Sequence, residues 1–217
     1  FRRVLFRSRM LKHFCLLPFA FCLLLFGCTR SELPADLVLV NGAEPDSLDP
    51  AIISTQTEMR VVKALFEGLT RLEGTNATPE PAIAHRWDIS PDGTVYTFHL
   101  RPEARWSNGD PVTSSDYRFA WFRMLLPDHG ADYAKLFRLI AGGDEFWRRR
   151  SESLREFATL ATGSDRLAAA EARFKACEAD FRSTVGIETP DPLTLRVRLV
   201  KPVPYFLSLT SFPPFFP

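Results

Sequence analysis

Side chains that could perform covalent chemistry or bind a metal are few and widely spaced in this sequence. Its four histidines are His13, His85, His99 and His129, and no two of them have the spacing of a metal-binding pair such as HExxH. The chain also lacks the GxSxG nucleophile elbow, the P-loop and the GxGxxG dinucleotide fingerprint. His99 alternates with aromatic residues, which favours a structural role on a strand. These patterns predict no metal, no cofactor and no catalytic residue.

Other polar clusters have the composition of turns and solvated surface. Asp46 and Asp49 could form a carboxylate pair, but both flank prolines and are expected to be turn residues. Residues 142–144, Gly-Gly-Asp, are too short to cradle a phosphate and are expected to form a loop. The three arginines at 148–150 are expected to face solvent. A secreted hydrolase, the alternative from another function class, would need its catalytic residues outside these 217 residues.

The four cysteines do not indicate a disulfide framework. Cys15 and Cys22 lie in an apolar segment near the start of the chain, and Cys28 follows that segment. Cys177 has helical spacing to Phe174 and Phe181. We therefore predict that Cys177 is a buried core thiol rather than a reactive one.

The start of the chain has the pattern of a secretory leader. A basic stretch from Met10 precedes the apolar run 14–26, which is shorter than the roughly 20 residues of a membrane span. The motif LFGC at 25–28 resembles a bacterial lipoprotein box, which implies lipidation of Cys28. We therefore predict a signal peptide over residues 1–27, with 1–9 a possible extension, and a lipid-anchor tether over 28–35. An ordinary signal cut elsewhere is the alternative.

The leader also changes the charge. The whole chain has a formal net charge of +1, but removing residues 1–27 takes away five of the 27 basic residues and none of the 26 acidic ones, which leaves −4. This charge and the leader argue against a nucleic-acid partner, including a cytoplasmic regulator fused to a DNA-binding helix-turn-helix.

The rest of the chain alternates between strand and helix patterns. The apolar run 37–40 and the alternating segments 95–100 and 193–199 predict strands, and the turn signal at 91–93 precedes the second of them. Helices are expected over 57–69, from a Thr113–Asp116 capping box to Pro127, and as a hairpin over 151–183. The expected fold class is therefore α/β.

Three motifs follow one another along the chain. EPDSLDP at 44–50 precedes LFEGL at 65–69; YTFHLR at 96–101 precedes ARWSNGDPVT at 104–113; and LVKPVPYF occupies 199–206. In this order they resemble the extracellular solute-binding proteins of family 5, the oligopeptide- and dipeptide-binding group of ABC importers.

The resemblance implies a periplasmic-binding-protein type II fold, in which two lobes close on a ligand and an α+β accessory domain is inserted in the first lobe. On this pattern residues 36–67 begin lobe one, 68–203 form the accessory domain and 204–217 return to lobe one. The second lobe is expected beyond Pro217, and the hairpin at 151–183 is an expected lineage insertion.

The same resemblance implies the site and the partners. Ser54, Thr55 and Gln56 match an extended segment that holds a peptide backbone, and Tyr133 matches a tyrosine that faces the ligand. The expected partners are an oligopeptide or dipeptide and an ABC permease in the membrane, and the protein is expected to be a lipid-anchored, extracytoplasmic monomer that is not an enzyme. Other members of the family bind nickel chelates, haem or sugars, so these ligands remain alternatives.

Overall fold

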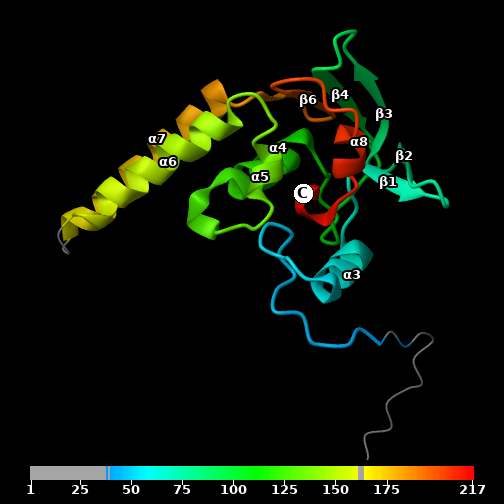
Figure 1. Cartoon of the computed structure of the whole chain (residues 1–217), viewed down its shortest axis with the longest axis horizontal. Coiled ribbons are helices and arrows are strands. Elements are labelled where there is room, and N and C mark those ends of the chain that lie inside the picture. The colour runs from blue at the N-terminus through cyan, green and yellow to red at the C-terminus, as the bar shows by residue number, and fades with distance from the viewer. Residues whose placement is uncertain (1–37, 39, 161–163) are drawn as a thin grey trace, which may run out of the picture. The chain divides into compact units, whose positions relative to one another are not determined.

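The structure is a computed structural model that describes residues 38, 40–160 and 164–217. It divides into residues 1–40 and a compact unit over 41–217, which Figure 1 shows. The strand predicted over 37–40 is wrong at its two described residues, because Val38 and Val40 lie outside any strand and are 76% and 84% exposed. A strand needs a neighbour for its backbone hydrogen bonds, and no described strand pairs with this segment.

An antiparallel four-stranded sheet carries the apolar core. Its order is β3 (Ala84–Ile89), β4 (Val95–Leu100), β6 (Thr194–Arg198) and β5 (Ile187–Asp191). The predicted alternation is confirmed, since Tyr96, Phe98 and Leu100 are buried along one face of β4. A separate small hairpin joins β1 (Thr70–Glu73) to β2 (Thr78–Pro81).

The helix α4 (Ser114–Leu125) packs against the sheet. Its predicted capping box is confirmed, because the N–H and hydroxyl of Thr113 donate to the Asp116 carboxylate at 2.7 and 2.9 Å. Trp121 is fully buried, and its indole N–H donates to the Phe215 carbonyl at 3.0 Å. Proline 127 follows and opens a short 3-10 helix (Pro127–His129), after which comes α5 (Ala134–Phe137).

The predicted hairpin is present, but it begins earlier than expected. It consists of α6 (Gly143–Ala158) and α7 (Ser164–Thr184), which lie side by side and project from the sheet (Figure 1). Gly143 therefore opens a helix instead of lying in a loop. Cys177 and Phe181 are buried as predicted, whereas Phe174 is 41% exposed although its ring lies 6.0 Å from that of Phe122 in α4.

The expected solvent exposure of the three arginines at 148–150 is wrong for Arg150. Its side chain is 8% exposed and donates to both oxygens of Asp128 at 2.9 and 2.6 Å. The other two arginines are exposed, and Arg149 donates to Asp180 of α7. The run spans less than one helical turn, so its members point in different directions.

The helix predicted over 57–69 is shorter in the structure. It forms α3 (Gln56–Leu65) and ends where Phe66 takes an extended conformation, so that Leu69 is buried beside β1 instead. The C-terminal segment contains α8 (Phe206–Leu209) and a 3-10 turn (Pro213–Phe215). It packs on the core around the sheet and α4 and on a smaller apolar cluster around α3. Phe215 stacks on Phe137 with ring centroids 4.0 Å apart, and Phe216 packs with Met59 and Val62 of α3.

Candidate functional site

The N-terminal end of α3 is held by a capping box that the sequence analysis missed. Glu58 is buried, and its carboxylate accepts the N–H groups of Ser54 and Thr55 at 2.9 and 2.8 Å. These backbone hydrogen bonds lower the pKa of Glu58 below its ordinary value of 4.5. The pattern Thr-x-x-Glu at 55–58 was the available signal, and it fixes the segment before the helix in one conformation.

The loop before this segment is fixed by Asp49. Its carboxylate accepts the Ala51 N–H at 3.0 Å, as a turn residue would, and it also binds the Arg123 guanidinium through both oxygens, one at 3.2 Å. Burial raises the pKa of Asp49, but the hydrogen bonds from Arg123 and Ala51 outweigh it, so the pKa lies below the ordinary 3.8. Because 74 residues separate the two partners, no local pattern indicated this ion pair.

The structure brings Tyr133 to the predicted segment 54–56. Its hydroxyl donates to the Ser54 carbonyl at 3.5 Å, and its ring packs edge-on against Phe212 with centroids 4.9 Å apart. Ser54, Thr55 and Gln56 are exposed, while Tyr133 is half-buried. The four residues named from the resemblance therefore lie at one place on the surface, with Phe212 as a neighbour that was not predicted.

The arrangement limits how this place could bind an extended ligand. The N–H groups of Ser54 and Thr55 are already bonded to Glu58, so they are not available to a ligand. The Ser54 carbonyl has a single long hydrogen bond and keeps a lone pair for another donor. The Gln56 N–H belongs to the first four donors of the helix, which have no partner within it. In the segment 54–56 the Ser54 carbonyl and the Gln56 N–H are therefore the acceptor and the donor that a ligand could use.

The remaining residues considered in the sequence lie partly within the described part of the chain. His99 lies 2.8 Å from Asp88 on neighbouring strands, where it forms a surface pair. Among the residues described, no group of three or more His, Cys, Asp or Glu is placed to hold a metal ion. None of the described helices is long and apolar enough to cross a membrane. Cys28 and the whole leader fall outside the described residues, so lipidation there stays a prediction.

Known proteins are similar to this chain over most of its length. The chain is 33% identical to the dipeptide-binding protein DppE of Bacillus subtilis (strain 168), an alignment that covers 89% of this chain and 33% of DppE. It is 32% identical to the probable deoxycholate-binding periplasmic protein YgiS of Escherichia coli (strain K12), with 82% and 28% covered. The chain thus spans about a third of the length of the curated relatives it matches.

A solved structure of an oligopeptide-binding protein is also similar to this chain. The Listeria monocytogenes OppA bound to peptide superposes with a TM-score of 0.63 at 34% sequence identity, covering 81% of this chain and 29% of that one. The fold described above is therefore that of an oligopeptide-binding protein over the matched residues. The family model for bacterial extracellular solute-binding proteins, family 5 (middle), matches residues 78–217. This chain belongs to the family 5 bacterial extracellular solute-binding proteins.

Proposed function

We propose that this chain forms one wall of the ligand site in a substrate-binding protein that captures peptides outside the cytoplasmic membrane and delivers them to an ABC permease. The observation that carries the proposal is the meeting of Tyr133 with the Ser54 carbonyl, beside exposed Thr55 and Gln56. The protein performs no covalent step in this function. It acts as a monomer without a cofactor, anchored through lipid on Cys28.

The proposed site recognises the peptide main chain. A donor and an acceptor on one edge can pair with a peptide whatever its side chains are, which gives affinity without strict sequence choice. Here the acceptor is the Ser54 carbonyl and the donor is the Gln56 N–H, because Glu58 occupies the N–H groups of Ser54 and Thr55. In the two-lobe arrangement residues 36–67 and 204–217 belong to lobe one and 68–203 to the accessory domain, and a second lobe closes over the ligand.

The Gln56 N–H can be removed with little disturbance to the helix. Gln56 is the first residue of α3, a position where proline is tolerated, and Thr55 has φ −100° and ψ 158°, which suits a residue before proline. Gln56→Pro in the protein expressed from its complete gene should therefore weaken peptide binding about five- to tenfold, the value of one hydrogen bond. Titration calorimetry with trialanine, chosen because it offers only main-chain groups, measures this effect.

Two controls make the result specific. Gln56→Ala keeps the N–H and should bind like the parent, and both Gln56 variants should keep the parent's melting temperature. Tyr133→Phe should weaken binding more than Tyr205→Phe, which removes the hydroxyl of an exposed tyrosine outside this segment. Equal affinities for Gln56→Pro and Gln56→Ala would show that the main chain of this segment does not pair with the peptide.

A second candidate ligand is a small non-peptide solute. The relative YgiS, 32% identical, is named as a probable deoxycholate binder, so this family framework also serves a steroid acid. Native mass spectrometry of the protein as purified separates the two candidates, because co-purified peptides give a ladder of residue masses and one solute gives a single mass. A single non-peptide mass, with no response to added peptides, would favour the second candidate.

A further inference from the structure

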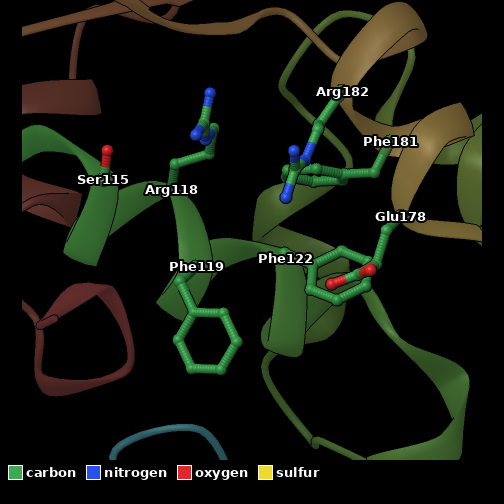
Figure 2. A pocket seen from close by; sticks show the side chains of 7 residues that line it. All are labelled: Ser115, Arg118, Phe119, Phe122, Glu178, Phe181 and Arg182. Atoms are coloured by element: carbon green, nitrogen blue, oxygen red, sulfur yellow. The ribbon is translucent and has the colours of Figure 1, made fainter. Parts of the chain in front are cut away.

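A pocket of about 210 Å³ lies between α4 and α7, and the function proposed above does not use it. Figure 2 shows its seven lining residues, and none of them is Tyr133 or belongs to the segment 54–56. The α4 wall is formed by Ser115, Arg118, Phe119 and Phe122, and the α7 wall by Glu178, Phe181 and Arg182. The pocket thus combines two guanidinium groups with an aromatic lining.

The two arginines differ from other arginines of α4, α6 and α7. Arg123 of α4 pairs with Asp49, Arg149 and Arg150 of α6 pair with Asp180 and Asp128, and Arg173 of α7 pairs with Glu156. In the described part of the chain, Arg118 and Arg182 form no ion pair within 4 Å with any carboxylate, Glu178 included. Figure 2 shows both side chains extending to the same side of the pocket.

Two cations at one pocket without an anion between them repel each other. Burial and the nearby charge of Arg182 lower the pKa of Arg118 below its ordinary value, which agrees with the geometry. An oxyanion between the guanidinium groups would remove this repulsion and accept hydrogen bonds from both, because carboxylate and phosphate oxygens match the guanidinium fork. The Ser115 hydroxyl on the same wall can add a third donor.

The aromatic side chains indicate what accompanies the charge. Phe122 and Phe181 are buried behind the pocket, but Phe119 is 60% exposed at its edge. A large exposed apolar side chain beside paired cations favours a ligand with an apolar group next to its oxyanion. We propose that this pocket binds a small organic oxyanion, a carboxylate or phosphate monoester, between Arg118 and Arg182, with the apolar part of the ligand against Phe119.

Glu178 makes the proposal sharply testable. Its carboxylate lines the same pocket and repels an anion there, so its removal should strengthen binding while removal of either arginine should weaken it. Phenyl phosphate and phenylacetate are the probes, and benzyl alcohol has the same ring without the charge. Resonance shifts of the 15N-labelled chain, followed as each probe is added, measure the affinities.

The expected result is saturable binding of at least one anionic probe, with a Kd on the order of 1 mM or tighter. Arg118→Ala and Arg182→Ala should each weaken it tenfold or more, Glu178→Gln should strengthen it about threefold, and benzyl alcohol should bind at least tenfold more weakly. Arg86→Ala, which changes an exposed arginine of β3, should have no effect. The tighter probe identifies the oxyanion as carboxylate or phosphate.

Three outcomes would overturn the proposal. They are the absence of saturable shifts with both anionic probes, equal binding by the parent and the Arg182→Ala variant, and equal binding of benzyl alcohol and the anions. Arg182 is exposed, so its variant tests the proposal even if Arg118→Ala destabilises the fold. Peptide affinity at the Ser54–Gln56 segment does not enter this test, so failure of the proposed function leaves it intact.

Discussion

Arg150 is buried and paired with Asp128, although it was expected to face solvent. The Arg150 side chain is 8% exposed and Asp128 is 29% exposed, and two hydrogen bonds join them. A buried ion pair adds little net stability over apolar residues, but loss of one partner leaves the other charge without compensation. The pair therefore ties α6 to the 3-10 turn after α4.

Arg150→Ala should lower the free energy of unfolding by about 2 kcal/mol, because it removes two charged hydrogen bonds to Asp128, whose carboxylate stays partly exposed to water. Arg149→Ala is the matched control one residue away. It removes an exposed pair with Asp180 and should cost less than about 1 kcal/mol. Urea unfolding of both variants measures the difference, and equal costs would mean that the Arg150 pair is solvated like its neighbour.

Cys177 should be nearly inert to alkylation in the folded protein. Burial raises the pKa of its thiol from the ordinary 9.0 to about 11, although the charge of Arg150 acts in the opposite direction. The reactive thiolate is then roughly a hundredfold rarer at pH 8 than for a free cysteine. Iodoacetamide labelling, followed by mass spectrometry of the Cys177 peptide, should be at least a hundredfold slower in buffer than in guanidinium chloride. Similar rates in both would contradict a buried thiol.

The loop over residues 44–55 is held in part by an ion pair with a distant residue, Arg123. Arg123 of α4 binds Asp49, and Asp49 fixes the turn at Ala51, three residues before Ser54. The proposed ligand segment is thus positioned from α4 as well as from its own capping box. Loss of the ion pair should loosen the loop while α3 remains folded.

This ion pair makes a pH-dependent contribution to stability. The pKa of Asp49 is lower in the folded chain than the unfolded 3.8, so its contribution is fully present above that value and is lost as the pH falls below it. Asp49→Asn should therefore cost about 1–2 kcal/mol at pH 7, and the difference from the parent should shrink below pH 3.8. Urea unfolding between pH 2 and pH 7 tests this. Asp46→Asn, in the same loop and exposed, should show neither effect.

Local patterns predicted the elements better than their contacts. The period-two pattern of 95–100 and the capping box at Thr113 depend on neighbouring residues, and both are confirmed. The box at Thr55 used the same kind of signal and was readable in principle. The pairing of Arg123 with Asp49 was not readable, because it depends on how α4 packs across the loop. The family resemblance assigned Tyr133 and Ser54 to one ligand site. It did not indicate that Glu58 bonds this segment or that Phe212 packs against Tyr133.

At the scale of the molecule, residues 41–217 form one compact unit although the resemblance divides them between a lobe and an accessory domain. Phe215 belongs to the core of the sheet and α4, while the next residue, Phe216, packs on α3. The C-terminal segment therefore contacts both of the expected parts: α3 of lobe one and α4 of the accessory domain. No periodicity in the Pro- and Phe-rich stretch indicated this, since the contacts of Phe215 with Phe137 and of Phe216 with α3 are long-range.

The membrane anchor is a prediction for the whole protein. Cys28→Ser should move the protein from the membrane fraction to the soluble extracytoplasmic fraction, because two or more acyl chains are needed for stable anchoring and this change removes their attachment site. Immunoblots of fractionated cells measure the shift, and the intact mass of the parent should show residues 1–27 replaced by lipid. A mature mass without lipid would instead indicate an ordinary signal cut.

The packing of Phe216 on α3 also fixes an order of events during synthesis. About 150 residues separate Val62 from Phe216, so a ribosome that adds 5–20 residues per second needs roughly 8 to 30 s between them. Until Phe216 is made, Met59 and Val62 lack one of the apolar side chains that pack against them. The apolar face of α3 is therefore incompletely covered during this interval and is open to chaperones that hold unfolded chains.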